Sequence, residues 1–168
     1  TIIENTKLTG IISGIDNSTL LTQITTITIR DSVKEISNEC FKDFVNFDNN
    51  DYDWIPDSLT KIGESAFENC TTITSIYSEN AISKIENRTY FGCTGLEDIT
   101  IPDSVTEIGD SAFQDCTGLT RIIIGNSVTE IGDSAFQGCT GLTSITFGNS
   151  VKEIGDLAFQ DCTGLTSI

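Results

Sequence analysis

The sequence SVTEIGDSAFQGCTGLTSITFGN, residues 127–149, decides the fold because its neighbours repeat it almost letter for letter. The 23 residues before it read SVTEIGDSAFQDCTGLTRIIIGN (104–126), and the next unit begins SVKEIGDLAFQDCTGLTSI (150–168). Self-similarity at a fixed period of about 20–50 residues is typical of solenoids and other repeat arrays. The sequence therefore predicts an array in which each 23-residue unit forms one coil.

Apolar residues keep fixed places in this unit. The same three places hold an isoleucine, an aromatic ring and a cysteine in five successive units. A single unit buries too few side chains to offset the roughly 1–2 kcal/mol of backbone entropy that each ordered residue costs. We therefore expect the units to stack and to share one continuous core. The three columns are Ile62, Ile85, Ile108, Ile131 and Ile154; Phe67, Tyr90, Phe113, Phe136 and Phe159; and Cys70, Cys93, Cys116, Cys139 and Cys162.

Two parts of the unit carry different hydrophobic patterns. The end of the unit, Leu142-x-x-Ile145-x-Phe147, alternates with a period of two, which predicts a short, half-buried strand. Residues 128–139 have apolar side chains at offsets of 0, 3, 7, 8 and 11, which predicts a turn or two of α- or 3₁₀-helix on the opposite side of the coil. Gly132 and Gly141 are predicted to lie at bends with positive φ, a conformation open to glycine.

The consensus S-V-T-x-I-G-x-x-A-F-x-x-C-T-G-L-T-x-I-x-I resembles the BspA-like leucine-rich repeats. The L-x-x-L-x-L core of leucine-rich repeats is present as Leu119-x-x-Ile122-x-Ile124. The match is strong over 102–168, good over 55–93 and weaker toward the N-terminus. The resemblance implies an α/β solenoid, which is a right-handed leucine-rich repeat array with short parallel strands on the concave face and helical or 3₁₀ turns on the convex side.

The array is expected to cover residues 20–168 as about six 23-residue units, truncated in the last unit, with residues 1–19 as an N-terminal cap or lead-in. We also expect the chain to be a fragment of a longer protein. Two units depart from the consensus. The unit that contains 44–59 is three residues longer than the others. In a later unit, Ser78 replaces an apolar strand residue and Glu86 replaces the usual glycine.

The charge balance excludes whole classes of partner. The chain has 9 basic and 25 acidic residues, a formal net charge of −16. Nucleic acid is excluded because its phosphate backbone is bound by Lys and Arg, and anionic membrane surfaces are disfavoured for the same reason. No apolar run reaches the roughly 18–20 residues of a membrane-spanning helix, so no membrane insertion is expected.

Catalysis finds little support in the sequence. The chain contains no histidine, which is the commonest general base. It also has no G-x-S-x-G nucleophile elbow and no Gly-rich phosphate-binding loop. We therefore expect a protein that is not an enzyme and that uses no cofactor.

The outward-facing strand residues are the candidates for ligand binding. In leucine-rich repeats the strands line the concave face, and along a strand outward residues alternate with buried ones. Trp54, Tyr77 and Arg121 are residue types favoured at binding hot spots. The alternative is that all of these are ordinary exposed strand residues. The candidate set is Trp54, Tyr77, Arg121, Tyr52, Thr100, Ile123 and Thr146.

The cysteine column and two acidic columns each allow a second interpretation. The cysteines are expected to be buried free thiols, with disulfides between neighbouring units as the alternative. The acidic columns, which include Glu130 and Asp133, are expected to form a solvated convex face, with Ca²⁺ binding as the alternative. No metal site is predicted, since the chain has neither C-x-x-C spacing nor histidine for zinc.

Two hypotheses about function follow. The first is a non-enzymatic protein-binding module that recognises an extracellular or host protein or glycan through the concave strand face. The BspA-like resemblance implies an adhesin-like role and an extracellular or cell-surface location. The second hypothesis is a structural spacer, or a self-associating segment of a larger surface protein, with no ligand of its own. We expect end-to-end self-association through the uncapped C-terminal repeat, where Phe159 and Leu165 lack a covering neighbour.

Overall fold

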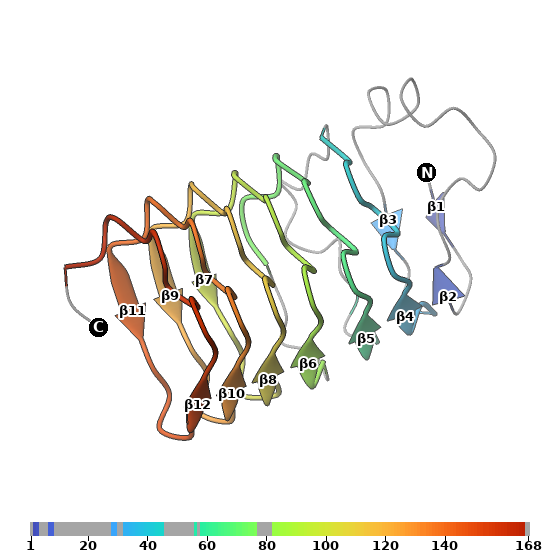
Figure 1. Cartoon of the computed structure of the whole chain (residues 1–168). Helices are drawn as coiled ribbons and strands as arrows, with labels where there is room; N and C mark the ends of the chain where they lie inside the picture. The colour runs from blue at the N-terminus through green and yellow to red at the C-terminus, as the bar shows by residue number, and fades with distance from the viewer. Residues whose placement is uncertain are drawn as a thin grey trace.

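The chain winds into a parallel β-solenoid of about five turns, with successive coils side by side (Figure 1). The structure is a computed structural model that describes residues 2–3, 7–8, 28–29, 32–45, 56, 58–76 and 82–166. All of the strand pairs among these residues are parallel. The strands are β1 (Ile2–Ile3), β2 (Lys7–Leu8), β3 (Thr28–Ile29), β4 (Glu35–Ile36), β5 (Lys61–Ile62), β6 (Lys84–Ile85), β7 (Asp98–Thr100), β8 (Glu107–Ile108), β9 (Arg121–Ile123), β10 (Glu130–Ile131), β11 (Ser144–Thr146) and β12 (Glu153–Ile154).

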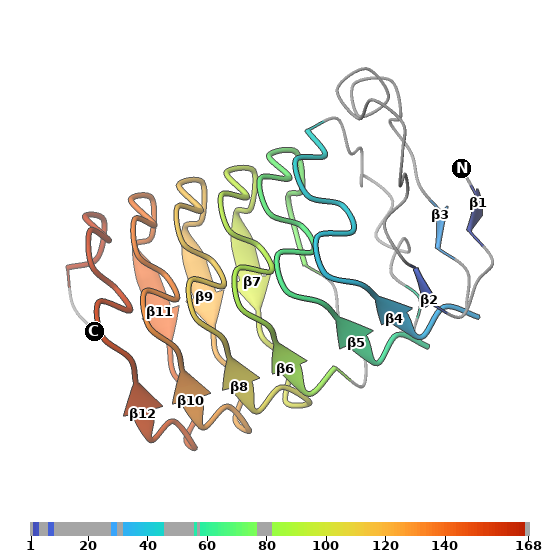
Figure 2. The ribbon, with the colours of Figure 1, turned by 45° about the vertical axis from the view of Figure 1, so that its right-hand side comes forward.

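From β6 onward, the coils contribute to two separate ladders. The two-residue strands form the order β12–β10–β8–β6, and the three-residue strands form the order β11–β9–β7. Figures 1 and 2 show the two ladders on different sides of the solenoid, joined by turns. The register joins residues that are 23 apart, such as Ile108 with Ile131 and Ile122 with Ile145. The sequence period is therefore the length of one coil.

Nearer the N-terminus, β2, β4 and β5 form a third sheet, and β1 pairs with β3. Of residues 1–19, the structure describes only β1 and β2, which pair with β3 and β4. The prediction that 1–19 forms a cap or lead-in therefore stays a prediction.

The parallel-strand solenoid is confirmed, but the predicted turn or two of α- or 3₁₀-helix over 128–139 is not confirmed, because no helix occurs in the described residues. The segment forms β10 followed by turns. Its N–H groups alternate between two kinds of partner. Ser134 N donates to Asp156 O and Phe136 N to Ala158 O of the next coil, both at 2.8 Å, whereas Gln137 N donates to Ser134 O within the segment at 3.0 Å. Ser134 also has a φ of 53°, a left-handed value that interrupts a right-handed helix.

The predicted reason for two repeated glycines is wrong. Gly132 and Gly141 are not among the residues with positive φ. They are required because neighbouring coils approach closely at these places. A Cβ on Gly132 would lie 2.7 Å from the backbone N of Asp110, and one on Gly141 would lie 2.6 Å from the carbonyl O of Thr117. Glycine here sets the spacing between coils.

The predicted apolar columns form the core, except at Ile154 of the last described coil, which is exposed. The aromatic rings from Phe41 to Phe159 stack coil on coil, with centroids 5.2–5.5 Å apart. Phe113 and Phe136 are fully buried. Burial of each such side chain stabilises the fold by roughly 1.5–3 kcal/mol. Because each ring covers the next, the stability of a coil depends on its neighbours.

Candidate functional site

The three-residue strands present two rows of exposed side chains. In β7, β9 and β11, the middle residue points toward the core and the first and third residues are exposed. Because the strands pair in register, these exposed residues line up across the ladder. We call the six residues of the two rows the outer face. One row is Asp98, Arg121 and Ser144, and the other is Thr100, Ile123 and Thr146.

Four of the seven candidate binding residues meet on this outer face. Thr100, Ile123 and Thr146 make up one row, and Arg121 is central in the other. The other three candidates, Tyr52, Trp54 and Tyr77, lie outside the described residues. A binding role for all seven stays a prediction.

Arg121 is exposed, but its charge is balanced by a neighbour. Its Nη2 donates to Asp98 Oδ2 at 2.9 Å, and Thr120 Oγ1 donates to Asp98 Oδ1 at 2.7 Å. Both members of the ion pair are at least half exposed. Such an exposed pair adds roughly 0–1 kcal/mol to stability. The pair fixes the orientation of the Arg121 guanidinium on the outer face.

Ile123 gives the outer face an apolar centre. Its side chain is 37% exposed and lies between Thr100 and Thr146 in the row. The inward residues of the same strands, Ile99 and Ile122, are buried. The alternation in the sequence identified the rows, and the register shows that one exposed isoleucine has a threonine on each side.

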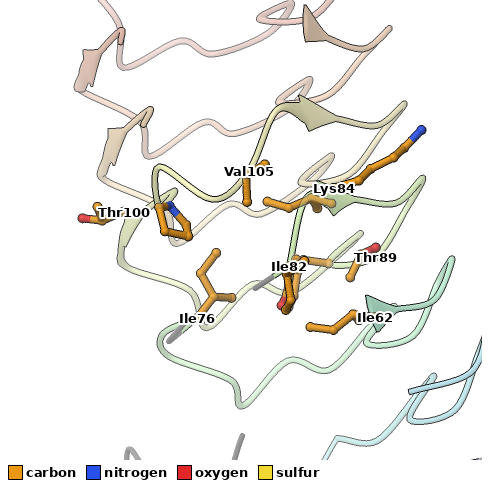
Figure 3. Close-up of a pocket in the computed structure, with 10 residues that line it drawn as sticks. Ile62, Ile76, Ile82, Lys84, Thr89, Thr100 and Val105 are labelled. Carbon is orange, nitrogen blue, oxygen red and sulfur yellow. The ribbon is translucent and has the colours of Figure 1, made fainter. Parts of the chain in front are cut away.

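A small apolar pocket lies next to the start of this ladder (Figure 3). Its walls include Ile62 and Ile76 from one coil, Ile82 from the next, and Val105 from the third. The Nζ atom of Lys84 points away from the pocket (Figure 3). The interior volume is about 20 Å³, room for about one water molecule. The repeat pattern does not predict this pocket, although the unusual Ser78 and Glu86 lie in the sequence of a unit that borders it.

The turns that follow the two-residue strands form what we call the turn side of the solenoid. The aspartates of the acidic column on this side accept hydrogen bonds from the backbone. Asp110 Oδ1 accepts from Asp133 N at 2.9 Å, and Asp133 Oδ1 accepts from Asp156 N at 2.7 Å. Each of these carboxylates therefore ties its own coil to the next one. Within the described ranges, no group of three or more Asp, Glu or Cys side chains is arranged to hold a metal ion.

The prediction of buried free thiols is confirmed for all six cysteines. Five of them, in the column from Cys70 to Cys162, donate from Sγ to a backbone carbonyl of the coil before, at 3.0–3.2 Å. Burial raises the pKa of Cys70 and of Cys116 to about 12. Such thiols are protonated at neutral pH and are poor nucleophiles.

Glu68 is a buried acid held by basic side chains from two neighbouring coils. Arg88 donates to it twice, Nε to Oε2 at 3.2 Å and Nη2 to Oε1 at 3.0 Å, and Lys42 Nζ lies 3.2 Å from Oε1. The Arg88 guanidinium also lies 3.9 Å from the centroid of the Phe91 ring. Burial raises the pKa of Glu68, but hydrogen bonds from Arg88, Ser65 and Lys42 outweigh burial and lower this pKa to about 2. The cluster joins coils and offers no open site.

The model of the BspA type leucine rich repeat region matches the chain in six copies, over residues 17–140 and 44–166. The chain belongs to the BspA-type leucine-rich repeat family. The family assignment by resemblance is therefore confirmed, and the 23-residue coils with their aromatic and cysteine columns are BspA-type repeats in this chain.

Solved structures of bacterial leucine-rich repeat proteins share this BspA-type fold. The leucine rich repeat protein of T. pallidum is 26% identical with a TM-score of 0.77, and the match covers 87% of this chain and 67% of that protein. A leucine-rich repeat protein from Bacteroides ovatus is 27% identical with a TM-score of 0.58, covering 85% of this chain and 48% of that protein.

A third solved structure is described as a leucine rich cell surface protein from Faecalibacterium prausnitzii. It is 25% identical with a TM-score of 0.56, and the match covers 84% of this chain and 46% of that protein. The chain thus spans about half the length of the second and third proteins. The comparison with curated proteins found no match. Among the residues that the structure describes, no helix has the length and apolar character needed to cross a membrane.

Proposed function

We propose that this chain is a non-enzymatic protein-binding module of a surface or secreted, adhesin-like protein, and that the outer face is its binding surface. The observation that carries the proposal is the exposed position of Ile123 in the middle of that face. An apolar side chain surrounded by polar and charged ones is the arrangement found at the centre of many protein interfaces. Arg121 adds a residue type enriched at such centres.

The backbone supports the outer face as a rigid platform. β7, β9 and β11 are parallel and in register, and their inward residues rest on the stacked core. Side chains on a rigid platform lose little backbone entropy when a partner binds. The threonine hydroxyls at 100 and 146 provide hydrogen-bonding groups on both sides of the apolar centre.

The relatives support the surface location in this proposal. The F. prausnitzii protein is described as a cell surface protein, and its structure shares the fold of this chain. We propose the same location for the protein that contains this array. An adhesin-like role, with an extracellular or host protein or glycan as ligand, belongs to the same proposal.

Capture of the purified chain on a panel of extracellular proteins and glycans tests the proposal. We expect saturable binding to a protein, reduced at least about tenfold by Ile123→Asp, because a buried unpaired carboxylate is costly at the centre of an interface. The matched control is Leu157→Asp, which adds the same charge at another exposed apolar residue, away from the outer face. Equal binding of both variants would contradict the outer face as the site.

A structural spacer or self-associating segment is the second candidate, and one observation favours it. In the last described coil, Ile154 is 49% exposed and Leu157 is 57% exposed. A further coil, of this chain or of a second copy, would cover both side chains. Sedimentation of the wild-type chain against Leu157→Asp tests this proposal. We expect concentration-dependent association that the substitution weakens, and monomers at all concentrations would contradict it.

A further inference from the structure

β5 and β6 lie next to each other in Figure 2, but they belong to different sheets, so the strand ladder is interrupted between them. In intact pairs of coils, the residue after the two-residue strand donates to the coil before. Gly63 N donates to Ile36 O at 2.9 Å, and Gly109 N donates to Ile85 O at 2.8 Å. Glu86 occupies the same position in the coil of β6. Within the described part of the chain, Glu86 N makes no corresponding bond to Ile62 O.

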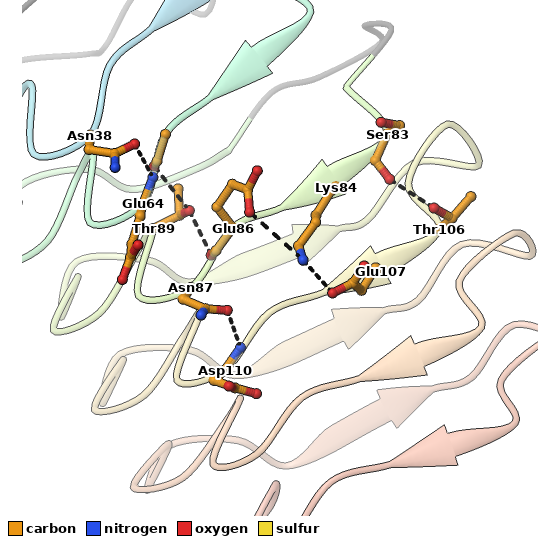
Figure 4. Close-up of polar contacts among 11 residues, drawn as sticks. Asn38, Glu64, Ser83, Lys84, Glu86, Asn87, Thr89, Thr106, Glu107 and Asp110 are labelled. Atoms are coloured by element: carbon orange, nitrogen blue, oxygen red, sulfur yellow. Dashed lines mark hydrogen bonds and ion pairs between the residues drawn. The ribbon is translucent and has the colours of Figure 1, made fainter.

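Two further contacts are missing at the same boundary. At the next boundary, Thr106 N donates to Ser83 O at 2.8 Å. Figure 4 shows the bond from Asp110 N to Asn87 Oδ1, at 2.9 Å. In the described residues, Ser83 N has no matching bond to the coil of β5, and neither has Asn87 N. The strand side of this boundary therefore lacks the hydrogen bonds that join the following coils.

Glu86 carries a Cβ where the coils of β5, β8, β10 and β12, each paired with the coil before, have glycine. A Cβ on Gly63 would lie 2.4 Å from a backbone N of the preceding coil, and one on Gly109 or Gly155 would lie 2.8 or 2.5 Å from the equivalent atom. Side chains do not fit at the spacing of those coils. In the coil of β4 this position holds Ser37, and β4 is nevertheless paired in register with β2, so the smaller serine side chain is accommodated there.

The same two coils are firmly joined on the turn side. Ser65 N donates to Asn87 O at 3.0 Å, and Phe67 N donates to Thr89 O at 2.9 Å. The Phe67 ring stacks on Tyr90 with centroids 5.5 Å apart. The ion pair of Glu68 with Arg88 spans this boundary as well. All three buried polar residues among the described side chains, Ser65, Glu68 and Thr89, lie here.

The small apolar pocket occupies the open side of the boundary. Ile62 faces it from the coil of β5, and Ile82 faces it from the coil of β6 (Figure 3). Ile85 of the coil of β6 lines it as well. The carboxylate of Glu86 lies 3.8 Å from Lys84 Nζ, and the Lys84 ammonium also pairs with Glu107 of the following coil (Figure 4). The carboxylate of Glu86 is thus paired with Lys84 of its own coil and not with a residue of the coil of β5.

We propose that the boundary between the coils of β5 and β6 is a conformational hinge. The Cβ of Glu86 keeps the strand side open, and the bonded turn side acts as the pivot. Bending there changes the angle between the block of β2, β4 and β5 and the block that carries the outer face. By sequence, the candidates Tyr52 and Trp54 precede the hinge, and Thr100, Ile123 and Thr146 follow it.

Amide hydrogen exchange of Glu86→Gly and Glu86→Ala tests the hinge. The two variants both remove the carboxylate and differ by the one methyl group that the proposal invokes. In Glu86→Gly, we expect the amides of residues 83 and 86 to exchange about tenfold more slowly than in the wild type, because they gain partners in the coil of β5. In Glu86→Ala, both amides should keep the wild-type rate. The amide of Thr106 is the internal reference.

Two results would overturn the proposal. Unchanged or faster exchange in Glu86→Gly would show that the Cβ does not hold the coils apart, since added flexibility alone speeds exchange. Equal slowing in both variants would assign the opening to the carboxylate instead. The reverse variant, Gly109→Ala, adds the Cβ to an intact boundary. We expect the amide of residue 109 to exchange at least about tenfold faster there, and an unchanged rate would also overturn the proposal.

Discussion

Glu68 shows how single residues bind one coil to another in this array. Its carboxylate takes hydrogen bonds from Arg88 of the next coil and an ion pair from Lys42 of the preceding one. Removing a partner of a buried charge costs more than the intact pair contributes, because the remaining charge stays out of water. The Glu68 carboxylate therefore links three neighbouring coils, and its contribution to stability depends on its being ionised.

The low pKa of Glu68, about 2 against 4.5 for the free side chain, makes stability depend on acid. A pKa that is lowered by folding adds stability above about pH 4.5, and this contribution is lost as the pH falls toward 2. We expect a loss of roughly 1–3 kcal/mol from this group, at the low end because its partner Arg88 is partly exposed.

Urea unfolding of the wild type and Glu68→Gln between pH 2.5 and 6 measures this loss. The wild type should be the more stable protein at pH 6, and the difference should shrink steadily as the pH falls. A difference that does not change with pH would show that the ionised carboxylate is not the stabilising form.

At the scale of one structural element, the aspartates of the acidic column accept hydrogen bonds from backbone N–H groups of the next coil. Asp133 accepts from the amide of residue 156, and its own amide donates to Asp110. We expect Asp133→Ala to lower the free energy of unfolding by about 1 kcal/mol, as does the loss of a helix N-cap. Asp133→Asn keeps the accepting oxygen and removes a like charge from the column, so it should be at least as stable as the wild type.

Thermal unfolding with added Ca²⁺ or EDTA distinguishes these hydrogen bonds from a metal site. The melting temperature of the wild type should be the same in both conditions. A rise with Ca²⁺ that Asp133→Asn abolishes would instead assign these carboxylates to a cation.

The predictions for individual elements succeeded where the signal was local. The alternation at Leu142, Ile145 and Phe147 predicted a strand, and β11 lies there. The spacing of apolar residues over 128–139 fits a helix, but alternate N–H groups of this segment, among them those of Ser134 and Phe136, bond to the coil that follows, 22 residues later in the chain. A short-range period carries no information about such a partner. For the same reason, the close approach at Gly132 could be found only from the coordinates.

At the scale of the whole molecule, the reactivity of the buried cysteines measures how readily each coil of the array unfolds. The five cysteines from Cys70 to Cys162 lie inside successive coils, and each is at least nine-tenths buried. We expect alkylation in native buffer at neutral pH to be at least about a hundredfold slower than in urea, with Cys162 of the last described coil reacting first. Mass spectrometry of the labelled peptides gives the order. Rapid labelling of Cys116 without denaturant would contradict the closed core.

The candidate site was predictable in part. The rows of the outer face followed from the strand period, and the ion pair of Asp98 with Arg121 joins residues one repeat apart. The hinge was signalled by Glu86 in a place that the consensus gives to glycine. Its meaning depended on the distance from a Cβ to the neighbouring backbone, which the coordinates supply and the sequence does not.

The stacked rings and shared carbonyls also bear on how this array changes in evolution. Nearly every coil offers the same contacts to the coil before and the coil after, so duplication or deletion of 23 whole codons leaves all remaining contacts matched. Unequal recombination between the almost identical segments that encode 104–126 and 127–149 would therefore lengthen or shorten the protein without unfolding it. The coil with Glu86 is not interchangeable in this way, because each extra copy would add another bending point.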